Sequence, residues 1–168
     1  MPKSNAKGDR WERNFVNALS ATDPDDDRDS YTRLGVDDFA FVRHFTALRL
    51  PASGAGRDAD LPDLHVWLRA DPDEVDEFAV EVKAGAERVR LSNDEVDALV
   101  RWSQTTGATP LVFVHIDKKS RHDALGGEYV VPIDELHSTG KGYTFTKARD
   151  TEDALTFADW CRSPCSSI

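Results

Sequence analysis

Residues 61–83 read Leu-Pro-Asp-Leu-His-Val-Trp-Leu-Arg-Ala-Asp-Pro-Asp-Glu-Val-Asp-Glu-Phe-Ala-Val-Glu-Val-Lys, which is the most informative segment of the sequence. Apolar and polar residues alternate over 64–69 and again over 78–84, which predicts two strands. The residues between them, 70–77, are polar and contain Asp-Pro-Asp, so they predict a turn. The stretch therefore predicts a β-hairpin.

The second strand of this hairpin has two unlike faces, because successive strand side chains point in opposite directions. Glu81 and Lys83 lie with Ala79 on one face, and an antiparallel register would bring Asp63 beside them. Two carboxylates and an ammonium group suit a hard metal ion and a phosphodiester, which predicts a metal-dependent nuclease. The alternative is an ordinary solvated strand face with a surface ion pair. The opposite, buried face would consist of Phe78, Val80 and Val82.

Length and composition indicate one soluble domain. A chain of 168 residues can bury one core but hardly two. No apolar run reaches the roughly 18 residues of a membrane span, and the N-terminus lacks the apolar core of a signal peptide. Cys161 and Cys165 are the two cysteines, and no histidine is near them in sequence. We therefore expect inert thiols near a frayed C-terminus, no structural zinc, no membrane partner and a cytoplasmic location.

The net charge of −10 comes from an unusual set of residues. The sequence has 22 aspartates against 9 glutamates, and 14 arginines against 7 lysines. This bias resembles that of proteins from halophiles that accumulate salt, as in a halophilic archaeon or its virus. In molar salt the Debye length falls to about 3 Å, so distant like charges hardly interact. The negative net charge therefore does not exclude a DNA substrate.

Residues 9–20 predict the first helix, with an apolar stripe that Glu12 shares. A carboxylate on a buried face is costly unless a group pairs with it. Glu12 is either a solvated first-turn residue favoured by the helix dipole or a third oxygen ligand beside Asp63 and Glu81. The stripe consists of Phe15, Val16 and Leu19.

Residues 21–46 give the weakest pattern. The charge run over 23–29 predicts a loop, and the aromatic residues of 36–45 predict a short helix packed on the body. A short strand over 47–50 should then end at Pro51 and enter a loop of small residues. Such a loop lets backbone and hydroxyl groups approach a phosphate closely, although it could equally be a linker.

The remaining chain predicts alternating helices and strands. Ser92 to Glu95 form a capping box that opens a helix, and Gly107 should end it. Residues 111–116 predict a strand buried on both faces. The fold class is therefore α/β, with a central mixed sheet flanked by helices. Further strands are expected at 129–133 and 143–147, and a short helix at 154–160.

Four motifs occur in the same order as in a known family. They are Lys-Gly-Asp-Arg-Trp-Glu-Arg at 7–13, Arg-Leu-Pro-Ala-Ser-Gly at 49–54, Pro-Asp at 62–63 and Glu-Val-Lys at 81–83. The chain resembles the archaeal Holliday junction resolvases, which belong to the PD-(D/E)xK nuclease superfamily. The resemblance implies a restriction-endonuclease-like core in a single nuclease domain. The segment at about 22–46 is an atypical insertion, longer than the family usually has.

The resemblance also implies roles for the matching residues. Glu12, Asp63 and Glu81 would hold Mg²⁺, with Mn²⁺ as a substitute and the Val82 carbonyl as a further ligand. Lys83 would orient the attacking water or stabilise the transition state, and Ser53 would meet the scissile phosphate from its loop. The residues expected to grip DNA phosphates are Lys7, Arg10, Arg13, Arg49 and Arg57.

The family implies a homodimer that acts on branched double-stranded DNA. Two sites related by a two-fold axis would make paired symmetric nicks in a four-way junction, with no small-molecule cofactor. Two alternatives stay open: a repair or restriction-type nuclease of the same superfamily, and a non-catalytic module that binds DNA or protein.

Overall fold

The computed structural model describes residues 6–20, 45–50, 61–71 and 73–162. A six-stranded sheet with the order β1-β2-β3-β5-β6-β9 forms the centre, and a three-stranded sheet with the order β4-β8-β7 lies beside it. The central strands are β1 (Phe45–Arg49), β2 (Leu64–Asp71), β3 (Glu74–Gly85), β5 (Thr109–Ile116), β6 (Gly127–Pro132) and β9 (Leu155–Thr156). The smaller sheet consists of β4 (Arg88–Leu91), β7 (His137–Thr139) and β8 (Gly142–Thr146). The helices are α1 (Ala6–Ser20), α3 (Asn93–Thr106), α4 (Lys147–Asp150) and α5 (Phe157–Arg162), with a 3-10 turn at Ile133–Glu135.

The predicted hairpin is formed by β2 and β3, which pair antiparallel with Leu64 opposite Val80. The strands are longer than predicted, because pairing continues to Asp71 opposite Glu74 and the turn is correspondingly tight. Strand β3 then pairs parallel with β5, and β5 pairs antiparallel with β6. The prediction of a mixed central sheet is confirmed.

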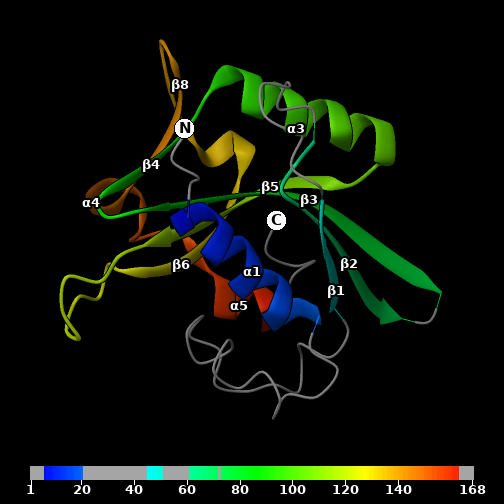
Figure 1. Cartoon of the computed structure of the whole chain (residues 1–168), viewed down its shortest axis with the longest axis horizontal. Coiled ribbons are helices and arrows are strands. Elements are labelled where there is room, and N and C mark those ends of the chain that lie inside the picture. The colour runs from blue at the N-terminus through cyan, green and yellow to red at the C-terminus, as the bar shows by residue number, and fades with distance from the viewer. Residues whose placement is uncertain (1–5, 21–44, 51–60, 72, 163–168) are drawn as a thin grey trace.

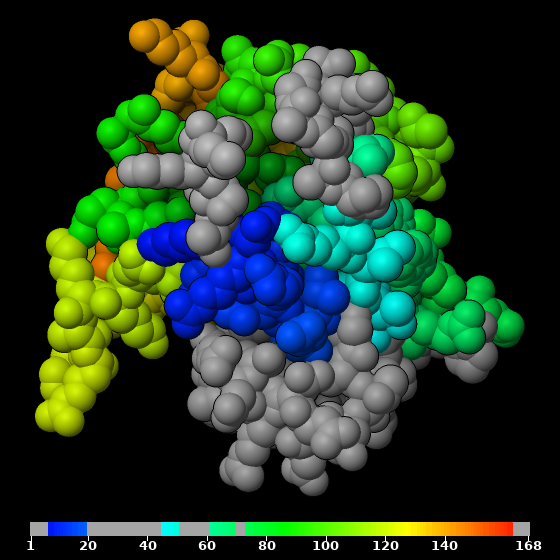
Figure 2. Space-filling model, in the orientation of Figure 1, coloured from blue at the N-terminus to red at the C-terminus, as the bar shows by residue number. Residues whose placement is uncertain are grey.

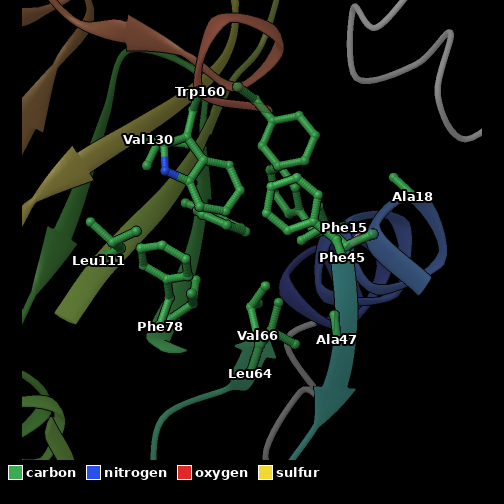
Figure 3. Packing of buried hydrophobic residues seen from close by; sticks show 14 of the residues in the cluster. Phe15, Ala18, Phe45, Ala47, Leu64, Val66, Phe78, Leu111, Val130 and Trp160 are labelled. Atoms are coloured by element: carbon green, nitrogen blue, oxygen red, sulfur yellow. The ribbon is translucent and has the colours of Figure 1, made fainter. Parts of the chain in front are cut away.

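One face of the central sheet is covered by α1 and α5 (Figure 1). Phe78, Val80 and Val82 lie on this face, as their alternation predicts. Rings from both helices pack together on the sheet: Phe15 of α1 lies 5.0 Å from Phe157 of α5, centroid to centroid. Figure 3 shows this core, in which Trp160 of α5 packs on Phe45, the first residue of strand β1.

The opposite face is covered by α3 and by the smaller sheet. The predicted capping box is confirmed: the Ser92 side chain accepts from the Glu95 amide, and the Glu95 side chain accepts from the Ser92 amide. Gly107 ends the helix in the left-handed conformation, with φ of 82°. The buried strand predicted at 111–116 is also confirmed, since all six of its residues are buried.

Three predictions at the chain's less regular parts need correction. Phe45 begins strand β1 instead of ending a helix, because its ring packs on Trp160 in the core; residues 21–44 lie outside the described part. The predicted helix at 154–160 starts only at Phe157, because Leu155 and Thr156 pair with β6. Cys161 is buried in the core, so the chain is not frayed there, and burial raises the pKa of its thiol. Cys165 lies outside the described residues.

The smaller sheet approaches the start of α3 closely. Gly142, at the first position of β8, has φ of +137°, which favours glycine. A Cβ atom at this position would lie 2.2 Å from the Leu91 carbonyl oxygen, one residue before the cap Ser92. The backbone contact therefore requires glycine. Among the described helices, none is long and apolar enough to cross a membrane.

Candidate active site

Asp63 and Glu81 lie next to each other at the entrance of the hairpin. Leu64 pairs with Val80 in the antiparallel hairpin, so the preceding residue, Asp63, lies opposite Glu81. The Val82 amide donates a hydrogen bond of 2.8 Å to Asp63 Oδ2. Two buried carboxylates side by side repel each other when both are ionised, so the charge of Asp63 adds to the effect of burial in raising the pKa of Glu81. Glu81 is 7 % exposed, so this pair is largely withdrawn from solvent.

Lys83 is held between two carboxylates. Its Nζ donates to Glu81 Oε1 at 2.8 Å and to Glu95 Oε1 at 2.6 Å. Glu95 comes from the first turn of α3, where its other oxygen caps the helix. The helix cap therefore fixes the direction of the lysine, whose side chain is 21 % exposed.

Glu12 enters from α1 and is bound by an arginine. Arg49 Nε, at the end of β1, donates to Glu12 Oε2 at 2.5 Å, while its Nη2 donates to Asp9 at 2.6 Å. The Glu12 side chain is only 14 % exposed, so it is not the solvated first-turn residue of the alternative interpretation. Asp63 also acts on Glu12, because its negative charge contributes to raising the pKa of Glu12. Asp63 thus connects Glu12 to Glu81.

These carboxyls carry more negative charge than the neighbouring cations balance. Burial, together with repulsion from Asp63, raises the pKa of Glu81 to about 8 despite the ion pair with Lys83. Burial likewise raises the pKa of Asp63 and that of Glu12. Burial alone would lower the pKa of Lys83, but the charges of Glu81 and Glu95 outweigh it and raise that pKa. A further cation would therefore be stabilised here.

The donor set fits a hard divalent metal ion. Glu12, Asp63 and Glu81 offer oxygen ligands only, which Mg²⁺ and Mn²⁺ prefer. Within the described segments, no three Asp, Glu, His or Cys side chains are gathered into a preformed metal-binding group. Arg49 and Lys83 occupy one oxygen each of Glu12 and Glu81 in this arrangement.

A set of contacts around His115 holds helix α1 in place next to the acidic residues. The ring of His115, at the end of β5, stacks on Trp11 with centroids 3.5 Å apart. Its two nitrogens lie 2.9 Å from Glu128 and 3.1 Å from Asp117. Lys7 binds the other oxygen of Asp117 at 2.5 Å. Since Trp11 precedes Glu12, this stack sets the position of the helix that carries the carboxylate.

The remaining predicted site residues fall into two groups. Arg10 and Arg13 are exposed on α1, whereas Arg49 is engaged by Glu12 and Asp9. Ser53 and Arg57 lie outside the described residues. Sequence reasoning missed Glu95, Asp9 and His115. The capping box identified Glu95 as a helix cap, but its contact with Lys83 depends on how α3 packs on β3.

Comparison with known proteins identifies the fold. The chain has the same fold as the 1.6 Å structure of Archaeoglobus fulgidus Hjc, a Holliday junction resolvase from an archaeal hyperthermophile. The TM-score is 0.61 at 20 % identity, over 93 % of this chain and 96 % of that one. None of the curated protein sequences compared with the chain matches it.

The sequence also matches a family, described as archaeal Holliday junction resolvase (Hjc), over residues 41–167. This match includes Asp63, Glu81 and Lys83 but begins after α1, so the position of Glu12 rests on the structure. Because the match spans about three quarters of the sequence, the chain belongs to the archaeal Holliday junction resolvase family.

Proposed function

We propose that this protein is a magnesium-dependent endonuclease that resolves four-way DNA junctions with the acidic site of Glu12, Asp63, Glu81 and Lys83. The observation that carries the proposal is the buried pair of Asp63 and Glu81 beside Lys83, in which the Val82 amide donates to Asp63 and the Lys83 ammonium donates to Glu81. These acids carry excess negative charge, and the chain's membership of the resolvase family supports a nuclease with its site here.

Each residue has a distinct task in this proposal. Asp63, Glu81 and Glu12 bind the metal, with the Val82 carbonyl as an additional ligand. A bound Mg²⁺ supplies charge neutralisation at the phosphate and lowers the pKa of its water. Lys83 would orient the attacking water or stabilise the transition state, while Glu95 keeps its ammonium group in place. Arg49 keeps Glu12 oriented, and Arg10 and Arg13 contact phosphates from the exposed side of α1.

The symmetry of a four-way DNA junction suggests that the protein acts as a symmetric homodimer. A homodimer with two such sites, acting in the cytoplasm, makes paired nicks in opposite strands of a branched duplex. Junction, fork, flap and linear duplex DNA compared at equal concentration test the preference for branched DNA. Cleavage of linear duplex as fast as the junction would contradict resolution as the function.

The site is tested with Asp63→Asn and with Asp97→Asn as the matched control, since Asp97 is exposed on α3. We expect D63N to lose junction cleavage by at least about 10²-fold while D97N keeps it. Mg²⁺ should raise the melting temperature of the wild type and of D97N but not of D63N, because only the native site binds the ion. Full cleavage by D63N would exclude this site.

A further inference from the structure

The outer face of the smaller sheet carries a row of cations. Strand β4 buries Val89 and Leu91, so its alternate residues Arg88 and Arg90 are exposed. The register places Arg90 opposite Thr144 on β8 and Thr144 opposite His137 on β7, while Arg88 faces Thr146. Basic and hydroxyl side chains thus form rows across three strands. Figure 2 shows the β7–β8 hairpin (orange) projecting beside β4 at one corner of the molecule.

These rows line a depression of about 610 Å³. No aspartate or glutamate is among its lining residues. Lys141, at the tip of the hairpin, and Arg149, within the single turn of α4, add two further cations. In this chain of net charge −10, a groove without carboxylates is an exception.

Most cations of the groove have no ion pair with the described residues, whereas several cations elsewhere in the molecule do. Lys7, Arg49 and Lys119 each bind a carboxylate within 2.6 Å. Arg149 also pairs, with Asp150. For Arg88, Arg90 and Lys141, the described segments provide no ion pair. Three cations without carboxylates, gathered in one groove, call for an anion from outside the chain.

The chemistry and the position favour a DNA backbone as that anion. Arginine binds a phosphate through two parallel hydrogen bonds, and threonine hydroxyls are common phosphate donors. Arg88 follows Lys83 by five residues, so their Cα atoms are at most about 17 Å apart. Duplex DNA carries about one negative charge per 1.7 Å of its axis. A duplex arm cut at Lys83 therefore presents many phosphates within reach of β4.

We propose that the groove formed by β4, β8 and β7 binds the phosphate backbone of a duplex arm of the substrate, as a contact separate from the acidic site. This inference rests on the proposed function, because it takes the substrate to be branched DNA. The groove holds the arm electrostatically and reads no sequence.

The test is the salt dependence of binding by Arg88→Gln/Arg90→Gln. The matched control is Arg69→Gln/Arg121→Gln, which removes two exposed arginines outside the groove. Binding of a four-way junction is measured with EDTA, over the salt range in which the melting temperature of each variant stays constant. Because each lost phosphate contact reduces the slope of log K against log salt by about 0.9, the groove variant should lose about 2 units of slope and the control none.

Cleavage measured on the same proteins separates this inference from the proposed function. With saturating junction and Mg²⁺, the groove variant should keep the wild-type rate, whereas its KM should rise about tenfold or more. An unchanged slope and KM in the groove variant overturn the inference and leave the acidic site untouched. Lys141→Gln, at the exposed hairpin tip, gives a smaller loss of about 1 unit of slope and decides the matter if the double variant does not fold.

Discussion

Lys83 and Lys147 are both enclosed by acidic groups, yet their surroundings are balanced differently. Lys147, at the start of α4, is 4 % exposed and donates to the Asp117 carbonyl at 3.0 Å and to the Asp123 carboxylate. The Lys119 amide, together with the Lys147 ammonium, lowers the pKa of Asp123 to about 2. One cation here meets one fully ionised acid.

Lys83 stands in a cluster where acids are in excess. Glu81 and Glu95 both accept from it, and Asp63 adds a third carboxyl that keeps the pKa of Glu81 near 8. The comparison teaches that burial of a lysine does not reveal its role. A lysine paired with one carboxylate, as Lys147 is, holds a loop in place. A lysine surrounded by an excess of carboxylates, as Lys83 is, lies where another cation can bind and where the charges can respond to substrate.

The largest effect should be on stability and belong to Lys147. Lys147→Met leaves the Asp123 carboxylate without its cation and the Asp117 carbonyl without its donor. We expect the melting temperature to fall by several degrees, since a domain of this size loses about 2–4 °C for each kcal/mol. Lys83→Met should lower it far less, because the site is partly exposed and Glu81 can bind a proton. Calorimetry of both variants without metal measures the two melting temperatures. Equal decreases for Lys147→Met and Lys83→Met would contradict the difference between the two lysines.

Cleavage should show the reverse order. Lys83→Met should slow junction cleavage at saturating DNA by about 10²–10³-fold, because a positioned cation near the phosphate is lost. Lys147→Met should keep the wild-type rate at a temperature where it is folded. Single-turnover kinetics measure both, with Lys118→Met as an exposed control. A fall in rate for Lys147→Met would show that its loop supports catalysis.

The next effect is a pH dependence of stability near Glu81. In metal-free protein, the folded state keeps a proton up to about pH 8 that the unfolded chain releases near pH 4.5. Stability is therefore present at low pH and is lost as pH rises through 8, by at most about 1.4 kcal/mol per pH unit. Urea unfolding with EDTA at pH 5 to 8 measures the slope. Glu81→Gln should flatten it, and Glu152→Gln, which is exposed, should not.

The smallest effect is the opposite pH dependence at Asp123. The folded state holds this carboxylate ionised down to about pH 2, so its stabilising contribution is present above about pH 4 and is lost as pH falls through 2. Asp123→Asn should lack this acid-induced loss. Unfolding curves between pH 5 and 2 compare it with the exposed control Asp134→Asn. Parallel curves for wild type and D123N would contradict the balanced pair.

The part of the site on the hairpin could be predicted because local rules determine it. Strand alternation put Glu81 and Lys83 on one face, and the register of a single hairpin brought Asp63 to them. The resemblance to the resolvases added Glu12. These contacts need only the geometry of neighbouring strands and one helix.

The rest depends on contacts between distant segments that no local pattern records. Arg49 was expected on phosphate, but β1 lies beside α1, and Arg49 binds Glu12 and Asp9 instead. Strands β4 and β8 pair across some fifty residues, so the separate sheet and its basic groove were not foreseen. The burial of Lys147 was missed for the same reason, since Asp117 and Asp123 reach it from a loop after β5.

Gly142 has a consequence for how the enzyme tolerates change. Any side chain there would push the hairpin away from Leu91, which is joined to the cap Ser92 and through Glu95 to Lys83. A substitution such as Gly142→Ala, at a position that contributes no side chain to the site, would thus be transmitted along the main chain to the surroundings of Lys83. The space available at one glycine therefore limits how far the position of the ammonium group can vary.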